Sequence, residues 1–257
     1  MSLQDRRVLI TGSTMGIGRA AAEALLKAGA KVAIHGRKLE RVEEAAASLG
    51  FPDRTFVVAG DVGDPDSCRA LVDSATELLG GLDYLVCNAG IGDLSYPEDI
   101  TEEHWDKVMD VNCRSGYLLT KFALPALRES RGAVLLVASA AGVCAGPSDN
   151  FAYAVAKAGM MSLAQSLAVE LAPAGIRINA LCPGFIDTPL IAEENAATGG
   201  QVHRFVEEAT LLGRIGTEEE CASTIEYLAT DAAAYFTGVP IVNDGGLTVQ
   251  RSWGGRN

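Results

Sequence analysis

The stretch Arg7-Val-Leu-Ile-Thr-Gly12-Ser-Thr-Met-Gly16-Ile-Gly18 decides the fold of this chain. It begins with a short β-rich run, passes through three closely spaced glycines, and leads into an alanine-rich segment that ends at Gly29. That order predicts a strand, a glycine turn and a helix. Glycines at this point let the backbone approach a phosphate group at the positive end of the helix. The context therefore favours a nucleotide-binding turn over the alternative, a purely structural turn.

The rest of the chain continues this alternation. Further strands are predicted at residues 31–35, 55–59, 83–87, 133–138, 176–181 and 239–242, and helices at 39–49, 64–79, 112–127 and 151–172, with two more beginning at Thr101 and Thr217. Strands that are apolar throughout are typical of a parallel sheet covered by helices on both faces. The prediction is an α/β protein with a Rossmann-type, doubly wound sheet of seven parallel strands. Ligands bind beyond the carboxyl ends of the strands in such sheets.

One segment departs from the pattern. At residues 185–213 the side chains of Glu193 and Glu194 and the pair Gly199-Gly200 interrupt any regular period. A mobile insert over a binding site is expected there. No linker or repeat divides the remainder, so a single domain over residues 1–257 is predicted.

Composition narrows the class of protein. The chain has 257 residues with 48% hydrophobic content, and its net charge of -12 argues against nucleic acid or an anionic membrane as partner. Six scattered cysteines form no Cys-x-x-Cys pair and no metal-ligand spacing, which indicates reduced thiols and no metal site. The amino terminus lacks the apolar core of a signal peptide, and no apolar run is long enough to span a membrane. A cytoplasmic protein is expected.

Residues 139–157 carry the catalytic hypothesis. Tyr153 and Lys157 are four residues apart, so on a helix they share a face, and Ser139 ends the preceding strand. A tyrosine that shuttles protons at neutral pH needs a lowered pKa, and an ammonium one turn away favours the phenolate. Ser139 could hold a substrate oxygen. Taken alone, Tyr-x-x-x-Lys is more often an ordinary exposed helical pair, so other stretches must decide.

Several motifs occur together in one order. They are Thr11-Gly12-x-x-x-Gly16-Ile-Gly18, Cys87-Asn-Ala-Gly90, Asn112, Ser139, Tyr153-x-x-x-Lys157 and Pro183-Gly184. In order and spacing they resemble the short-chain dehydrogenase/reductase family, in its single-domain branch similar to 3-oxoacyl carrier-protein reductases, over almost the whole chain. The resemblance implies that Tyr153 is the acid/base and that Lys157 lowers its pKa and holds the nicotinamide ribose. It also implies that Ser139 binds the substrate oxygen and that Asn112 anchors a proton-relay water.

The same resemblance implies a set of coenzyme contacts. They are Gly12, Ser13, Thr14, Met15, Gly16, Ile17 and Gly18 in the turn, Asp61 and Val62 at the adenine, Asn88, Ala89 and Gly90 under the adenosine ribose, and Pro183, Gly184, Ile186 and Thr188 toward the carboxamide, together with Tyr153 and Lys157. Taken singly, Asn88, Asn112 and Asp61 are better explained as turn, helix-start or cap residues, whereas taken together they favour the coenzyme contacts. Two departures from the family pattern stand out. Cys87 replaces a frequent asparagine, and the stretch from Ser139 to Tyr153 is one residue longer than usual, which would reshape the substrate pocket.

Coenzyme choice is read after the second strand, in His35-Gly36-Arg37-Lys38. No carboxylate is present to hold the ribose hydroxyls of NAD, and Arg37 can fork onto a 2′-phosphate. NADP(H) is therefore the preferred coenzyme. NAD(H) is kept as the alternative, because Met15 stands where many NADP-using relatives carry a second basic residue. An exposed Arg-Lys pair at a helix start is the other interpretation of this segment. The three histidines show no triad or metal geometry, so a hydrolase or metalloenzyme has no support.

The sequence predicts an NADP(H)-dependent oxidoreductase that acts on a ketone or a 3-oxoacyl group. The alternatives are an NAD-dependent alcohol, polyol or steroid dehydrogenase and, in another class, a non-catalytic dinucleotide-binding regulator. The expected pocket has apolar walls and no fixed cationic side chain apart from Arg204, which suits a neutral ketone. Its lining comprises Ala141, residues 143–151, Phe185 and residues 190–212. A homotetramer is expected, with a dimer as the alternative. Helices at 112–128 and 151–173 would form one interface, and the last helix and strand another.

Overall fold

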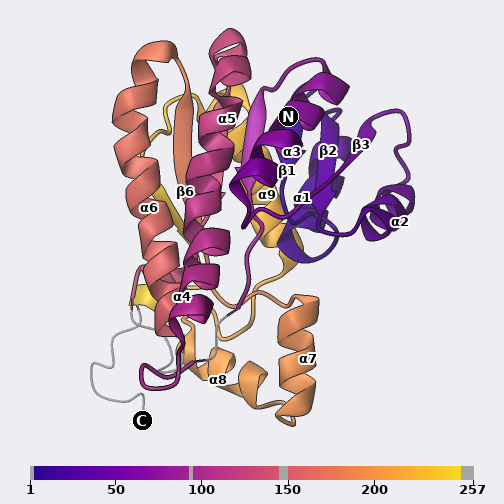
Figure 1. The fold of residues 1–257 in the computed structure, drawn as a ribbon. Helices are drawn as coiled ribbons and strands as arrows, with labels where there is room; N and C mark the ends of the chain where they lie inside the picture. The colour runs from indigo at the N-terminus through magenta and orange to yellow at the C-terminus, as the bar shows by residue number, and fades with distance from the viewer. Residues whose placement is uncertain (1–2, 93–94, 145–149, 250–257) are drawn as a thin grey trace.

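A computed structural model describes residues 3–92, 95–144 and 150–249 of the chain. Its centre is one sheet of seven strands in the order β3-β2-β1-β4-β5-β6-β7, and every neighbouring pair is parallel (Figure 1). The strands are β1 Arg7–Ile10, β2 Lys31–Gly36, β3 Thr55–Ala59, β4 Tyr84–Cys87, β5 Ala133–Val137, β6 Arg177–Pro183 and β7 Pro240–Asn243. This confirms the predicted doubly wound fold. The strand order reverses between β1 and β4, and ligands of doubly wound sheets bind at such a point, beyond the carboxyl ends of the strands.

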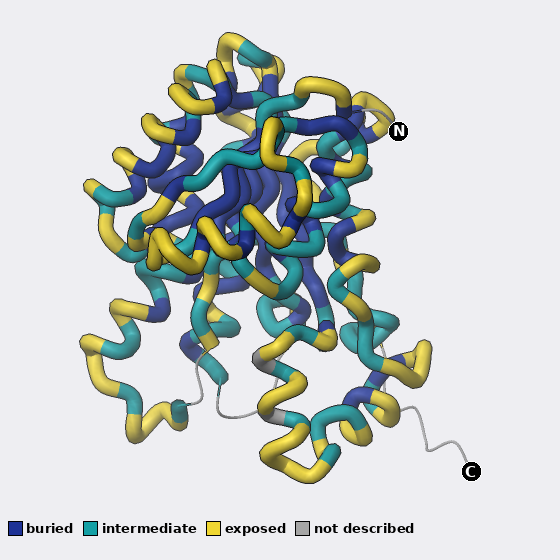
Figure 2. Tube along the Cα trace, turned by 90° about the vertical axis from the view of Figure 1, so that its right-hand side faces the viewer, coloured by how far each residue is buried: buried dark blue, intermediate teal, exposed yellow. Residues whose placement is uncertain are grey.

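Helices cover both faces of the sheet. One face packs against α1 (Gly16–Lys27), α2 (Leu39–Leu49) and α9 (Glu218–Ala229), and the other against α3 (Pro65–Leu79), α5 (Ser115–Ser130) and α6 (Phe151–Leu171). Figure 2 shows the buried strands between these two layers. Every residue of β4 and β5 is buried, which explains why their sequences are continuous apolar runs. None of the helices in the described ranges is both long and apolar enough to cross a lipid bilayer.

The predicted helix starts are confirmed by their caps. Asp64 accepts a hydrogen bond from the amide of Asp66 at 3.1 Å, directly before Pro65 at the first position of α3. Thr217 and Glu220 form the reciprocal capping box of α9. Thr101 caps the helix α4 (Glu102–Met109), which continues into α5 through a π-helical turn, η1 (Asp110–Arg114). These local hydrogen bonds determine the residue at which each of the three helices begins.

The segment 185–213, expected to be an insert without a regular period, is partly helical. The segment contains two short helices, α7 (Pro189–Ala197) and α8 (Gln201–Ala209), which follow β6 and lie beyond its carboxyl end (Figure 1). Gly199 and Gly200 separate them, with left-handed φ angles of 61° and 84° that favour glycine. Each helix has nine residues, but only α8 carries a helical period in the sequence, with apolar residues at Val202, Phe205 and Val206, whereas α7 has none.

Candidate active site

Ser139 and Tyr153 meet at the carboxyl edge of the sheet. Ser139 follows β5 and caps a short 3₁₀ turn, η2 (Ala140–Gly142), where its hydroxyl accepts the amide hydrogen of Ala141 at 3.2 Å. Tyr153 lies in the first turn of α6, and the hydroxyl of Ser139 is near enough to act on the phenol, whose pKa it lowers. Two residues fourteen positions apart in the chain therefore present their hydroxyls together.

Lys157 lies one turn further along α6 and is 3% exposed. Its ammonium donates a hydrogen bond to the carbonyl of Val137 at 2.8 Å. Burial lowers the pKa of Lys157 to about 8, because an ammonium loses its hydration in the interior. The thiols of Cys113, Cys182 and Cys87 act in the opposite direction on this pKa. Lys157 therefore titrates close to neutral pH rather than near its ordinary value.

The expected lowering of the Tyr153 pKa is not found in this structure. Burial raises the pKa of Tyr153, and the hydroxyl of Ser139 opposes this rise without cancelling it. The ammonium of Lys157 lies 5.4 Å from the centroid of the tyrosine ring, and its bond goes to a backbone carbonyl. In the coenzyme-free protein, the loss of water around the phenol is thus the larger effect.

Asn112 is fully buried in the π-helical turn η1. Its side-chain oxygen accepts the amide hydrogen of Ile91 at 2.9 Å, and its side-chain nitrogen donates to the carbonyl of the same residue at 2.9 Å. A Cβ atom added to Gly90 would lie 2.7 Å from the Asn112 oxygen and 3.4 Å from the Lys157 nitrogen. Glycine at this position therefore lets the end of β4 approach both side chains. The amide of Asn112 fixes this backbone segment next to Lys157.

The glycine turn packs against the residues that directly follow β4. Gly12 and Gly16 have left-handed φ angles of 65° and 64°, and a Cβ atom on Gly12 would lie only 2.8 Å from the Cα of Ala89. Asn88 donates from its side chain to the carbonyls of Thr11 at 3.0 Å and of Gly12 at 2.9 Å. The hydroxyl of Thr11 accepts the amide hydrogens of Asn88 and Ala89. Thr11 was not among the predicted site residues; its signal is a lone hydroxyl at the end of an aliphatic strand.

Ser13 has a different role from the one predicted. It is fully buried, its hydroxyl donates to Ile10 at 2.8 Å, and the same oxygen accepts the amide hydrogen of His35 at 2.8 Å. Its hydroxyl is thus engaged inside the protein and supports the turn rather than facing a ligand. Met15, by contrast, is 53% exposed at the start of α1.

The residues predicted to meet the adenosine end lie beyond β2 and β3. The Asp61 side chain accepts the amide hydrogen of Gly63 at 2.9 Å, while the hydroxyl of Ser67 accepts the amide hydrogen of Asp61 at 2.8 Å. Val62, next in the chain, is buried. Arg37 is exposed after β2 and has no hydrogen-bond or ion-pair partner among residues 3–92, 95–144 and 150–249. Its guanidinium is therefore available to a ligand.

The segment after β6 also lies at the carboxyl edge of the sheet. Pro183 ends the strand, the amide of Gly184 donates to the carbonyl of Asn243 at 2.9 Å, and Ile186 forms a β-bridge with Gly216. The methyl group of Thr188 lies 3.8 Å from the position that a Cβ atom on Gly16 would occupy. Of the residues predicted to contact the carboxamide, Thr188 thus lies near the glycine turn.

The helix α8 covers the substrate side. Phe205 on α8 packs edge to face against Phe185, with 5.8 Å between the ring centroids. His203 lies 3.7 Å from Asp187, and the guanidinium of Arg204 donates to the carbonyl of Gly199 at 3.3 Å. The part of the longer Ser139–Tyr153 loop at residues 145–149 lies outside the described residues.

This chain is similar to known dehydrogenases and reductases over nearly its whole length. A family model described as enoyl-(acyl carrier protein) reductase matches residues 12–248. Human dehydrogenase/reductase SDR family member 4 is 35% identical, covering 95% of this chain and 88% of the relative. The D-beta-hydroxybutyrate dehydrogenase of Rhizobium meliloti (strain 1021) is 34% identical, covering 95% and 99%. The NADP active-site complex of Pseudomonas aeruginosa RhlG superposes with a TM-score of 0.90 at 32% identity, covering 96% and 98%.

Proposed function

This chain belongs to the short-chain dehydrogenase/reductase family, and from that membership we propose that it reduces a carbonyl group, or oxidises the corresponding secondary alcohol, by hydride exchange with a bound NADP(H). It is an NAD(P)-dependent dehydrogenase/reductase; the coenzyme preference, the direction and the substrate class are the proposed parts. The observation that carries the proposal is the proximity of Ser139 and Tyr153 beside buried Lys157.

The carboxyl edge of the sheet fits a dinucleotide. Gly12 and Gly18 let the turn pack closely against Ala89 and Asn88, while the open Cβ position of Gly16 leaves room for a ligand at the start of α1. Backbone amides at the positive end of this helix could meet a pyrophosphate there. Arg37 would hold the 2′-phosphate of NADP(H), since its guanidinium is exposed and unpaired within the described residues. After β6, Ile186 and Thr188 would hold the carboxamide.

The acid/base roles follow from the positions of Ser139, Tyr153 and Lys157. The hydroxyls of Ser139 and Tyr153 lie together, so one carbonyl oxygen of a substrate could accept a hydrogen bond from each. The raised pKa of Tyr153 keeps the phenol protonated at neutral pH, which suits a residue that donates a proton to a developing alkoxide. Lys157, with its pKa near 8, would resupply that proton, and Asn112 would hold the adjoining backbone in place.

The substrate side favours a neutral, apolar ketone. Phe185 and Phe205 form an aromatic pair, and Leu211 and Leu212, which follow α8 in the chain, add exposed apolar surface. Arg204, the one cation in the predicted lining, is bonded to a carbonyl within its own segment. A phosphorylated sugar would lack a fixed partner for its charge on this side. A 3-oxoacyl thioester, whose reacting carbonyl is neutral, satisfies the same requirement.

One observation favours the NAD-dependent alternative. Met15 is exposed beside the glycine turn and supplies no second positive charge for a 2′-phosphate. In addition, one relative is named D-beta-hydroxybutyrate dehydrogenase, and a dehydrogenase works in the oxidative direction. The ratio of the dissociation constants of NADPH and NADH separates the two candidates.

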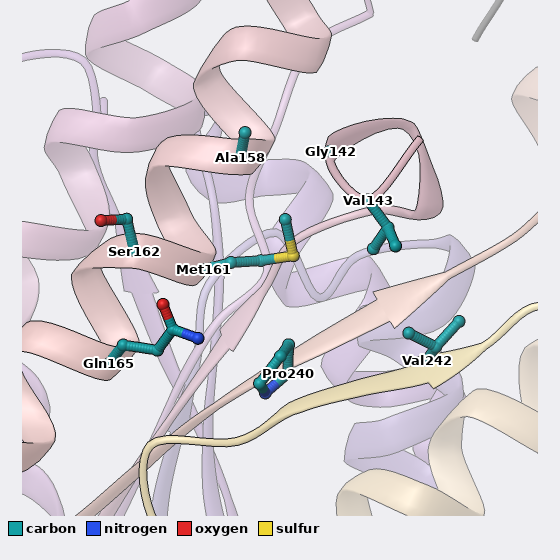
Figure 3. A pocket seen from close by; sticks show the side chains of 8 residues that line it. All are labelled: Gly142, Val143, Ala158, Met161, Ser162, Gln165, Pro240 and Val242. Atoms are coloured by element: carbon teal, nitrogen blue, oxygen red, sulfur yellow. The ribbon is translucent and has the colours of Figure 1, made fainter. Parts of the chain in front are cut away.

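The outer face of α6 suits an interface between copies of the chain. Val155 and Val169 are 46% and 74% exposed on this helix, although apolar residues lie around most of its circumference. A hollow of about 300 Å³ separates α6 from the edge strand β7 (Figure 3). Its lining residues are Gly142, Val143, Ala158, Met161, Ser162, Gln165, Pro240 and Val242. Together with β7, this face supports a homotetramer. The six free cysteines and the composition suit the cytoplasm.

A panel of ketones and secondary alcohols with both coenzymes tests the proposed function. We expect coenzyme-dependent turnover, followed by absorbance of the reduced nicotinamide, to be fastest with neutral ketones and NADPH. The absence of turnover with every member of the panel, in a protein that still binds coenzyme, would favour the regulator instead.

A further inference from the structure

His35 joins two parts of the carboxyl edge of the sheet through the two nitrogens of its ring. The residue ends the buried portion of β2 and is 2% exposed. The amide of Gly12 donates a hydrogen bond to Nδ1 at 3.1 Å, and Nε2 lies 3.0 Å from the carbonyl oxygen of Gly60. Since an amide can only donate and a carbonyl can only accept, Nδ1 is unprotonated and Nε2 carries the hydrogen. The imidazole is therefore neutral and held in one tautomer.

The two bonded groups belong to different turns. Gly12 begins the glycine turn after β1, and Gly60 directly precedes Asp61 and Val62 after β3. Strand β2 lies between β1 and β3 in the sheet, so the ring spans the carboxyl ends of three adjacent strands. Two backbone bonds strengthen this frame, from the Ser13 amide to the His35 carbonyl at 2.9 Å and from the Gly60 amide to the Gly36 carbonyl at 3.2 Å.

We propose that His35 is a positioning residue that fixes the glycine turn relative to the Asp61 turn, so that the pyrophosphate and adenosine ends of one nicotinamide coenzyme are held in register. The inference rests on the proposed function, because it assumes that a dinucleotide lies across both turns. His35 itself touches neither end of the coenzyme in this account. It acts through the backbone of Gly12 and Gly60.

An imidazole suits this position for chemical reasons. It offers an acceptor and a donor on different sides of a rigid ring, whereas an apolar side chain would leave a partly buried amide and carbonyl without these partners. Burial lowers the pKa of His35 to about 4, against a weaker opposing effect from the charge of Asp61. The ring therefore stays neutral, and both hydrogen bonds persist, at the pH values where the coenzyme is used.

Three substitutions separate the two bonds. His35→Asn places an amide near the position of Nδ1 and can keep the bond from Gly12, whereas His35→Gln reaches the position of Nε2 and can keep the bond to Gly60. His35→Phe preserves the ring shape and loses both. Unfolding midpoints of the coenzyme-free proteins show which variants are folded; should His35→Phe not fold, the Asn and Gln variants carry the test.

The measurement compares a whole coenzyme with a fragment of it. NADPH binding is followed by nicotinamide fluorescence, and binding of adenosine 2′,5′-bisphosphate, which lacks the nicotinamide half, by calorimetry. If the wild type prefers NADH, the pair is NADH and AMP. We expect His35→Phe to weaken the dinucleotide about tenfold or more and the fragment about twofold or less, with smaller dinucleotide losses for Asn and Gln. At saturating coenzyme, kcat should stay within about twofold of wild type.

A positioning role and a merely structural one differ in these readouts. Equal losses for dinucleotide and fragment would indicate general loosening and overturn the inference, as would unchanged binding of both in a folded variant. Either result leaves the proposed function intact if the wild type binds coenzyme and turns over ketones. A wild type that binds neither NADPH nor NADH would instead refute the proposed function, and this inference with it.

Discussion

The ammonium nitrogen of Lys157 lies 5.4 Å from the centroid of the Tyr153 ring, buried over the face of the residue that it is expected to assist. Its charge is retained in the interior with one hydrogen bond, to the carbonyl of Val137. The two groups share an environment that has lost its water, and burial shifts both pKa values toward the neutral form, upward for the phenol and downward for the ammonium. The buried charge of Lys157 therefore lowers the stability of the folded protein.

Lys157→Met should remove that cost while abolishing turnover. The pKa of Lys157 is about 8 in the folded protein against an ordinary 10.5, so the unfolded state binds more protons between these values and stability rises with pH across them. Below about pH 8 the folded protein carries the full penalty. We expect the variant to be more stable at pH 7 by about 1 to 3 kcal/mol, less any loss from the unpaired Val137 carbonyl.

Denaturant unfolding at pH 7 and at pH 10.5 measures this effect. The gain should shrink toward zero at the higher pH, where the wild-type lysine is neutral. A variant that is less stable than wild type at both pH values would contradict the view that Lys157 is a strained, desolvated cation.

Arg37→Ala should weaken NADPH far more than NADH. The exposed guanidinium has no partner within the described part of the chain, so the lost contact is the one to the 2′-phosphate, worth about 1.5 to 3 kcal/mol. Fluorescence titration with both coenzymes checks it, with Lys38→Ala as the matched neighbouring control. If Arg37→Ala weakens the two coenzymes equally, Arg37 does not read the phosphate.

Glu218→Gln should bind coenzyme several-fold more tightly at neutral pH. A carboxylate oxygen of Glu218 lies 4.0 Å from the Cβ position of Gly16, at the turn where a pyrophosphate would sit. Burial, and then the charge of Glu219, raise the pKa of Glu218, which shows that its negative charge is disfavoured there. Because the wild-type carboxyl becomes neutral as the pH falls, the advantage of the variant should disappear in acid.

Exposed Glu219→Gln is the control for net charge in this prediction. The test is the dissociation constant of the coenzyme, measured from pH 5 to 8 for the wild type, Glu218→Gln and Glu219→Gln. A variant Glu218→Gln that binds coenzyme no better than wild type at pH 8 would show that this carboxylate is too far from the pyrophosphate to matter.

The assembly should be a homotetramer in which α6 is covered by a neighbouring copy. Val169→Glu places a charge on the exposed apolar surface of this helix, where the wild-type side chain is 74% exposed and contributes little to the core of one copy. We expect dissociation to smaller species and reduced turnover, because α6 carries Tyr153. Light scattering and activity measured together check this. A fully active wild-type monomer of 26.8 kDa at micromolar concentration would refute the assembly and its link to the site.

The predictable features of this protein are those encoded locally. The glycine turn, the caps at Asp64 and Thr217, and the apolar strands are short-range patterns, and they suffice to predict the sheet and its helical layers. The juxtaposition of Ser139 and Tyr153 follows from their places after β5 and at the start of α6. Residues that follow parallel strands meet at the carboxyl edge of the sheet, so their places in the sequence are enough to predict that they lie close together.

The features that sequence did not predict depend on tertiary contacts. The role of His35 requires knowing that Gly12 and Gly60 lie on either side of its ring, and the three strands that bring them together are separated in the chain. Likewise, the raised pKa of Tyr153 depends on how much water the fold removes from the phenol, which the spacing to Lys157 does not report. The nine residues of α7 carry no amphipathic pattern, whereas α8 has apolar residues at helical spacing and could have been predicted from the sequence.

Single-turnover reduction of a ketone by Tyr153→Phe tests the account most directly. The substitution removes only the hydroxyl that lies near Ser139, and it leaves the ring beside Lys157. We expect NADPH to bind within about twofold of its wild-type affinity while the rate of coenzyme oxidation falls by a factor of about 100 or more, as for loss of a general acid. A variant that binds coenzyme normally and reduces the ketone at the wild-type rate would contradict the assignment of Tyr153 as the proton donor.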